Sequence, residues 1–373
     1  MANHTVGKTV VVHKDGFAYI SHPSIAVLSD GGWIAAFCHS RRRKPGMHPP
    51  DDPLYRNLLS RSADQGKTWQ EPYFAPDFNW SGVETPGIAR LSDGTVVLTQ
   101  FRYGWYPLGL AKKRKAAGEP IFISLPDRGW TEDFTDAEWD DAQYSWARGY
   151  HGLYAHLSTD DGDTFETVKI GTGPYGDGFT RTGVVEISDG RVAYSVTEHH
   201  PPKSRHTYLL MSRDDARSWD APTLIVESRE LSYTEPHLAE VGNGELYCIL
   251  RTANLGGYLY SCRSLDGGQS WSVPGPTPMY GLPGHLLVLD DGRLLCTYGR
   301  REVPFGIRAC LSEDGGRTWL IDDEIIVRDD LPNSDLGYPT TIEYEPGRLF
   351  VCYYGQQHDG VTYVQGTYVS LAS

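Results

Sequence analysis

The chain has 373 residues, of which 39% are hydrophobic and 22% charged, a composition that excludes a disordered or collagen-like protein. Its formal net charge of −14 at pH 7 argues against a nucleic-acid partner, and no apolar run approaches the roughly 18 residues of a membrane helix. The 23 tyrosines and 10 tryptophans, against 4 methionines, favour strands over helices.

The N-terminal segment lacks the charged and apolar regions of a signal peptide, so we expect a cytoplasmic chain, although a mature exported chain given a new initiator methionine would look the same. Residues 6–13 read as a single strand. The six cysteines form no Cys-x-x-Cys pair, so we expect free thiols, no metal site and no cofactor.

An octapeptide with the pattern Ser-x-Asp-x-Gly-x-Thr-Trp occurs five times, once in a looser form. The copies begin at Ser62, Ser158, Ser212, Ser264 and Ser312. In such a motif the serine and aspartate side chains cap a tight turn, the glycine supplies a positive φ, and the aromatic residue packs on the core. We therefore predict that the octapeptides are structural and not catalytic.

A second repeat is a two-residue turn, mostly Asp-Gly, between apolar runs. It stands at 30–31, 93–94, 189–190, 243–244, 291–292 and 346–347. Such turns are strong hairpin signals, and an octapeptide follows each one except the last. Four strands per unit and six units predict an all-β fold, a six-bladed β-propeller with four-stranded antiparallel blades. The sixth unit lacks its fourth strand, which residues 6–13 would supply, closing the ring.

Two register positions in each unit are predicted to face a central pocket. Nine residues before each turn glycine, at the entry to the innermost strand, stand His22, Thr85, Arg181, Glu235, Pro283 and Tyr338. At a similar distance after the turn stand His39, Arg102, Glu198, Arg251, Arg300 and Gly355. Positions equidistant from a hairpin turn become neighbours, so charged and aromatic side chains should converge there.

With these octapeptides, which are Asp boxes, and with Glu235, Arg251, Arg300 and Tyr338 in this order, the whole chain resembles the sialidase (neuraminidase) superfamily of Asp-box, or BNR-repeat, propellers. The resemblance implies that Tyr338 is a nucleophile and Glu235 its base. It also implies that Arg251 and Arg300 bind a sugar carboxylate, with Arg301 and Arg308 as competitors for the second position.

The chemistry fits these residue types. A phenol titrates near 10, so a tyrosine nucleophile needs a neighbouring base, and a neutral phenol avoids repulsion from an anionic substrate. Guanidinium groups bind carboxylates in a bidentate manner. Sialidases are known exceptions to the use of two carboxylates in glycoside hydrolysis.

The chain departs from the superfamily in the first unit, where Ser21-His22-Pro23 stands in place of the Arg-Ile-Pro that supplies the first arginine of the carboxylate clamp. Candidates to replace it are Arg41, Arg42, Arg43, Arg102 and Arg181. The acid/base of the superfamily corresponds to Asp51 or Asp52. We also place His22 and Glu198 among the substrate-binding candidates.

The second unit carries an insertion, roughly 103–150, between its second and third strands, and we expect 1–373 to form a single domain around it. The insertion contains eight tryptophans and tyrosines and should lie on the pocket face. These aromatics would stack on sugar rings or form a lid, or simply form a satellite core under a long loop.

These residues predict a retaining exo-glycoside hydrolase of the sialidase type that acts on a terminal acidic sugar, sialic acid or a related one. A second interpretation is a uronate-specific polysaccharide lyase, in which Tyr338 or a histidine abstracts the α-proton. A third is a noncatalytic sugar-binding propeller. Each implies an acidic glycan as partner, without nucleic acid or membrane, and leaves the oligomeric state open.

Overall fold

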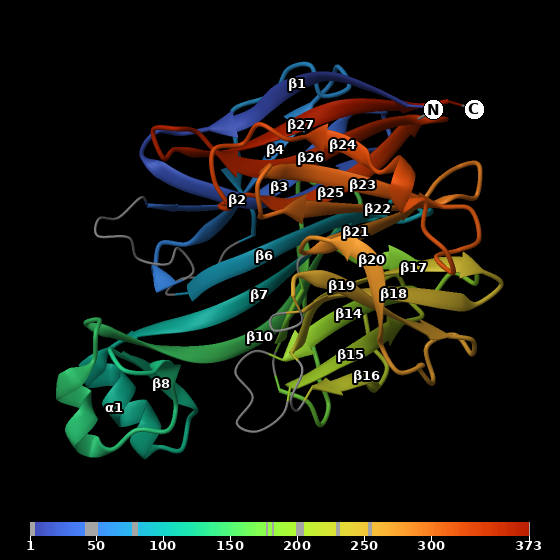
Figure 1. The fold of residues 1–373 in the computed structure, drawn as a ribbon. Coiled ribbons are helices and arrows are strands. Elements are labelled where there is room, and N and C mark those ends of the chain that lie inside the picture. The colour runs from blue at the N-terminus through green and yellow to red at the C-terminus, as the bar shows by residue number, and fades with distance from the viewer. Residues whose placement is uncertain are drawn as a thin grey trace.

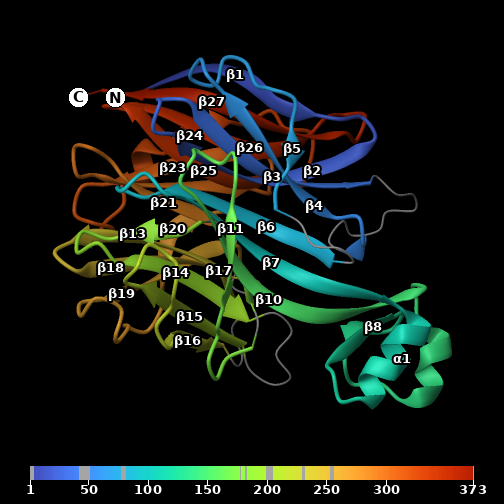
Figure 2. The same cartoon turned by 180° about the vertical axis from the view of Figure 1, so that it is seen from behind.

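The computed structural model describes residues 4–41, 51–76, 81–176, 178–180, 183–198, 205–228, 232–252 and 256–372. Their strands pair into six antiparallel sheets arranged around a common centre (Figures 1 and 2). The innermost strands of all six sheets contribute residues to one axial channel. The predicted all-β propeller of antiparallel sheets is therefore confirmed.

Three sheets consist of four strands in chain order. The first contains β2 (Ala18–Val27), β3 (Trp33–Arg41), β4 (Arg56–Ser62) and β5 (Tyr73–Phe74). The fourth contains β17 (Tyr233–Gly242), β18 (Glu245–Thr252), β19 (Tyr258–Ser264) and β20 (Gly275–Tyr280). The fifth contains β21 (Gly284–Val288), β22 (Leu294–Arg300), β23 (Gly306–Ser312) and β24 (Ile325–Arg328), with the short 3-10 helix η3 (Ile321–Asp323) before β24.

The sixth sheet joins the two ends of the chain. It contains β25 (Gly337–Glu345), β26 (Arg348–Gln356), β27 (Thr362–Leu371) and β1 (His4–Lys14). β1 pairs with β27 in an antiparallel register that sets Val6 opposite Val369. The prediction that the N-terminal segment supplies the missing strand is confirmed, and this pairing covers the edge that β27 would otherwise expose.

The second sheet holds the predicted insertion. Its four repeat strands are β6 (Ser81–Arg90), β7 (Val96–Pro107), β10 (Trp146–Ser158) and β11 (Glu166–Ile170). The ends of β7 and β10 run into the insertion, which also contains α1 (Leu108–Ala116), β8 (Ile121–Leu125), β9 (Gly129–Thr131) and the 3-10 helix η2 (Asp136–Asp141). It projects from the propeller beside the first two sheets (Figure 1).

The third sheet departs from the predicted four strands because its innermost strand is split. The two pieces are β12 (Gly178–Phe179) and β13 (Val185–Glu186), which both pair with β14 (Val192–Glu198). The sheet continues with β15 (Arg205–Ser212) and β16 (Thr223–Ser228). The second sheet keeps its four repeat strands and adds β8 and β9 of the predicted insertion, so the prediction of four strands per unit is wrong for the third sheet.

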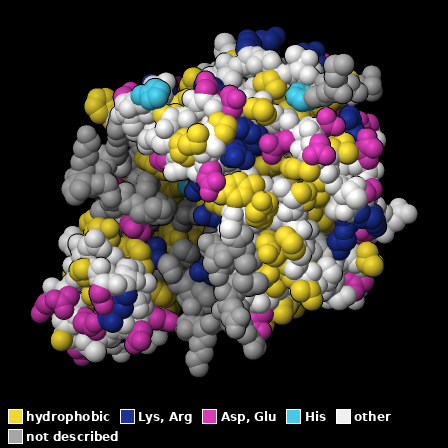
Figure 3. Space-filling model, viewed as in Figure 1, with side chains coloured by type: hydrophobic (Ala, Val, Ile, Leu, Met, Phe, Trp, Pro, Cys, Tyr) yellow, Lys and Arg dark blue, Asp and Glu magenta, His cyan; other side chains and the backbone are white. Residues whose placement is uncertain are grey.

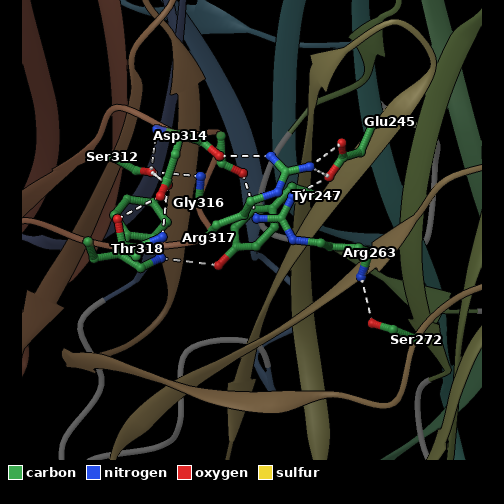
Figure 4. A network of polar contacts seen from close by, with 11 residues as sticks. Glu245, Tyr247, Arg263, Ser272, Ser312, Asp314, Gly316, Arg317 and Thr318 are labelled. Carbon is green, nitrogen blue, oxygen red and sulfur yellow. Dashed lines mark hydrogen bonds and ion pairs between the residues drawn. The ribbon is translucent and has the colours of Figure 1, made fainter.

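The Asp boxes form hydrogen-bonded turns, as Figure 4 shows for the copy in the fifth sheet. The Ser312 hydroxyl donates to Asp314 (2.8 Å) and accepts the Gly316 N–H (2.7 Å). The N–H and the hydroxyl of Thr318 donate to the same carboxylate, and these bonds lower the pKa of Asp314 to about 2. The carboxylate is engaged in the turn itself, in agreement with a structural role.

Glutamates near the end of three innermost strands tie neighbouring sheets together. Each accepts a backbone N–H from the hairpin turn of the preceding sheet, in the pairs Ser92–Glu186, Ser188–Glu240 and Asp290–Glu343, at 2.6, 2.5 and 2.7 Å. These contacts hold the innermost strands in a fixed relation, and the opposite ends of two of them, β17 and β25, carry side chains of the candidate site.

Candidate active site

Three innermost strands share the same irregularity at their entry. His22, Glu235 and Tyr338 have positive φ values of 51°, 47° and 48° although none is glycine, and each is followed by proline. The pairing of each strand shifts register at this point. A bulge of this kind re-aims a side chain, and strained backbone of this kind concentrates at functional sites.

These strained residues form a buried cluster with Arg251. The Tyr338 hydroxyl donates to Glu235 Oε1 at 3.0 Å. One nitrogen of Arg251, Nη1, donates to both the Tyr338 oxygen and Glu235 Oε2, each at 2.8 Å. Tyr338 is 6% exposed and Glu235 4%, whereas the Arg251 side chain is 23% exposed. A carboxylate can take the phenolic proton here, and a guanidinium can stabilise charge on the oxygen left behind.

His22 lies against the ring of Tyr338. The two ring centroids are 4.1 Å apart, with an interplanar angle of 67°. His22 Nδ1 is held by the hydroxyls of Ser21 at 2.6 Å and Tyr55 at 3.3 Å. The structure thus brings together His22, Glu235, Arg251 and Tyr338, as the register argument predicts.

Arg301 lies on Tyr338, and Arg300 does not. The guanidinium carbon of Arg301 is 5.4 Å from the Tyr338 ring centroid, and its Nε donates to the Leu336 carbonyl. Burial lowers the pKa of Arg301, but electrostatic interactions with Tyr354, Tyr338 and other neighbours are stronger in sum, so the pKa of Arg301 is raised. Arg300, the preferred candidate from sequence, lies over Tyr280 at 5.6 Å. Successive side chains of a strand point to opposite faces, so a one-residue error in register reverses the assignment.

The two candidate acids lie in different surroundings. Asp51 accepts a hydrogen bond from the Trp130 indole at 2.6 Å and lies 3.9 Å from Arg148, both in the insertion. Asp52 is buried, and its carboxylate accepts the Leu54 N–H at 2.9 Å.

The other sequence candidates lie elsewhere or outside the described residues. Arg41 is exposed and lines a surface depression with Leu54 and Phe74. Arg102 lies 5.8 Å from the Tyr154 ring. Glu198 is buried and accepts N–H groups from Gly176 and His206 within the third sheet. Arg42, Arg43 and Arg181 lie outside the described residues.

Sequence reasoning missed a tyrosine–carboxylate group behind Tyr338. The hydroxyls of Tyr354 and Tyr19 both donate to Asp335, at 3.0 and 2.8 Å, and the Tyr354 ring centroid is 6.0 Å from that of Tyr338. Burial raises the pKa of Tyr354. The sequence contains a pattern that could have identified Tyr354 as a residue near the site. Tyr354 stands seven residues after its turn glycine, as Arg251 does.

The described residues contain no group of three or more His, Cys, Asp or Glu side chains that could hold a metal ion. His237 and His285 stack with ring centroids 4.4 Å apart in the axial channel. Across these described ranges, no helix is long and apolar enough to span a membrane.

Solved structures with the same fold include several sialidases. A protein of unknown function from Dyadobacter fermentans DSM 18053 aligns over 100% of both chains with 23% identity and a TM-score of 0.84. The Hadza microbial sialidase Hz136 aligns over 95% of this chain and 66% of its own, with 16% identity and a TM-score of 0.64. The NanB sialidase from Streptococcus pneumoniae aligns over 97% and 70%, with 15% identity and a TM-score of 0.66.

These identities establish the shared fold alone. No curated protein matches the sequence. Residues 138–351, more than half of the chain, match the family described as the BNR repeat-like domain. The chain therefore belongs to the BNR repeat-like domain family.

Proposed function

We propose that this chain is a retaining exo-glycoside hydrolase of the sialidase type, acting on a terminal acidic sugar from a single six-bladed propeller domain spanning 1–373. One observation carries the proposal: the buried Tyr338 hydroxyl donates to Glu235 while Arg251 donates to both. The sialidase fold of the solved structures above supports it.

In the proposed reaction, Glu235 takes the phenolic proton as Tyr338 Oη bonds to the anomeric carbon. The bond from that carbon to the leaving oxygen breaks, and a carboxyl group of the first sheet, Asp51 or Asp52, protonates the oxygen. Water then attacks the anomeric carbon and loses a proton to that same carboxylate. The bond to Tyr338 breaks, and Glu235 returns the proton to the phenol.

The substrate is proposed to be acidic because cations surround the nucleophile. Arg251 and Arg301 both lie on Tyr338, and paired guanidinium groups suit a carboxylate. A carboxylate nucleophile would repel such a substrate, whereas a neutral phenol does not. We propose sialic acid or a related sugar acid, with Arg301 taking the place that the sequence assigned to Arg300.

A second candidate function is a uronate lyase. Its supporting observation is His22, which contacts the Tyr338 ring and directly follows Ser21, the position where the resemblance implies an arginine. In this reaction Tyr338 or His22 would remove the proton α to a neutralised carboxylate, and the leaving oxygen would depart without addition of water. The product would be an unsaturated sugar that absorbs ultraviolet light.

The test is hydrolysis of an aryl sialoside by the wild type, Tyr338→Phe, Glu235→Gln and the control Tyr280→Phe. We expect turnover in the wild type and the control, and a loss of at least about 100-fold in both site variants. Absence of turnover in every protein contradicts the proposal. A screen of uronate polymers for ultraviolet absorption then tests the lyase, and sugar binding without any product would indicate a noncatalytic propeller.

A further inference from the structure

Arg148 of the insertion is a buried cation enclosed by aromatic rings. Its side chain is 2% exposed, and its guanidinium carbon lies 4.6 Å from the Trp130 ring centroid and 4.7 Å from that of Tyr103. Aromatic faces attract a cation but do not replace a counter-charge, and a buried charge is costly without one. A carboxylate does lie near it among the described residues.

That carboxylate belongs to Asp51, which lies in the connection between β3 and β4 of the first sheet. Arg148 Nη1 is 3.9 Å from Asp51 Oδ1, and the Trp130 indole donates to the same oxygen at 2.6 Å. The Trp146 indole donates to the Asp51 main-chain oxygen at 3.2 Å. Burial and the charge of Asp51 together raise the pKa of Tyr144. Four side chains of the insertion thus gather around a single residue of another sheet.

The loop that follows Asp51 leads directly to the nucleophile. Asp52 accepts the Leu54 N–H on its carboxylate and the Tyr55 N–H on its carbonyl, both at 2.9 Å, which forms a tight turn. The buried Tyr55 hydroxyl lies 3.3 Å from His22 Nδ1, and His22 packs on Tyr338. A continuous path of contacts therefore runs from the insertion to the ring of the proposed nucleophile.

The Asp51 carboxylate is engaged by the insertion, because Oδ1 accepts the Trp130 indole N–H and lies 3.9 Å from the Arg148 guanidinium. Figure 3 shows that the surface is hollowed between the projecting insertion and the body of the propeller, with Lys or Arg side chains inside. The contacts to Asp51 fix how the insertion meets the first sheet.

We propose that Asp51 is a positioning residue, through which the insertion holds the turn 52–55 behind His22 and Tyr338, and not the proton donor. The proposal rests on the proposed function for its link to catalysis, but the docking itself does not depend on it. The proposal explains why the aromatic-rich insertion, which connects two strands of the second sheet, forms its polar contacts with a loop of the first sheet.

The catalytic test compares two glycosides of the same acidic sugar, one with a nitrophenyl and one with an alkyl leaving group. We expect Asp51→Asn and Trp130→Phe to lower kcat by the same factor on both, with the control Trp139→Phe unchanged, since Trp139 packs on Phe134 instead. Loss of a general acid costs about 10²–10⁴-fold and falls mainly on the poor leaving group. That selective loss in Asp51→Asn overturns the proposal.

A second measurement needs no turnover. Hydrogen exchange is measured at the amides of Leu54 and Tyr55 in the wild type, Asp51→Asn, Trp130→Phe and Trp139→Phe. We expect exchange there to rise at least about tenfold in the first two variants only, because local stability of the turn depends on the docking. Unchanged exchange overturns the proposal. Raised exchange in a protein that hydrolyses neither glycoside supports the docking and contradicts the proposed function alone.

Discussion

At the scale of single residues, the candidate site depends on side chains held in an unfavourable backbone conformation. His22, Glu235 and Tyr338 adopt a left-handed φ that glycine would accept more readily, and each precedes a proline. Such residues cost of order 1–3 kcal/mol each and persist only where the surroundings impose them. The bulge turns each side chain toward the others, and the hydrogen bonds among Tyr338, Glu235 and Arg251 are the result.

Two neighbouring arginines, Arg300 and Arg301, are alternatives for binding the carboxylate of the proposed substrate, and substitution of each distinguishes them. We expect Arg301→Met to raise KM for an aryl sialoside by about 10–100-fold, because a hydrogen bond to a charged group contributes about 1.5–3 kcal/mol. Arg300→Met should leave KM within about threefold, since Arg300 lies over Tyr280. Steady-state kinetics on both variants decides, and the reverse pattern would reinstate Arg300.

Whether the sequence predicts the position of a site residue depends on whether that residue belongs to a regular hairpin. Counting from the turn glycine places His22, Glu235 and Tyr338 correctly because the same bulge recurs in three sheets. The count reaches Arg300, which ends β22 and lies over Tyr280, whereas Arg301, the next residue, lies on Tyr338 because successive side chains point to opposite sides. The partners of Asp51 come from an insertion in another sheet, and no count along one hairpin can reveal them.

At the scale of elements, the Asp boxes and hairpin turns predict the strands well because each is a local structure with its own capping bonds. These repeats do not predict that the innermost strand of the third sheet is split into β12 and β13. The segment has the same length and the same following turn as the innermost strands that are continuous. Nor do the repeats predict the internal structure of the insertion, whose contacts are formed with distant parts of the chain.

The second sheet contains a histidine that should make folding sensitive to acid. His156 of β10 is buried between β7 and β11, where it bonds to Gln100 at 2.8 Å and to Thr167 at 2.8 Å. Burial lowers its pKa from 6.5 to about 4. Between pH 6.5 and 4, His156 is therefore protonated in the unfolded chain but neutral in the folded chain. The contribution of neutral His156 to stability is complete above pH 6.5 and is lost as the pH falls toward 4.

Because of His156, we expect the free energy of unfolding to fall by about 3 kcal/mol as the pH is lowered from 6.5 to 4, at about 1.4 kcal/mol per pH unit. Urea unfolding at a series of pH values measures the slope. His156→Gln should flatten it, whereas His358→Gln, on the exposed loop before β27, should not. Equal slopes in the wild type and His156→Gln would contradict the assignment.

At the scale of the whole molecule, the two chain ends pair in the sixth sheet, at the end of the strands opposite Tyr338. β1 completes the sixth sheet, and Val12 of β1 belongs to the same buried cluster as Trp33, Phe350 and Tyr338. The strand that closes the ring therefore packs on the core that supports the proposed nucleophile. Neither the closure of the ring nor the packing of β1 on this core can be recognised in a single repeat, because both depend on pairing the first strand of the chain with the last sheet.

Adjacent valines of β1 test this closure, because they face opposite sides of the sheet. Val12 is buried and Val11 is 51% exposed. We expect Val12→Ala to lower the free energy of unfolding by about 2 kcal/mol, through lost contacts and a residual cavity, and Val11→Ala to change it by less than about 0.5 kcal/mol. Denaturant unfolding gives both values. Since Val12 and Tyr338 share a core, Val12→Ala should also lower kcat on the aryl sialoside more than Val11→Ala does. Equal effects of the two variants on stability would mean that β1 does not close the ring in solution.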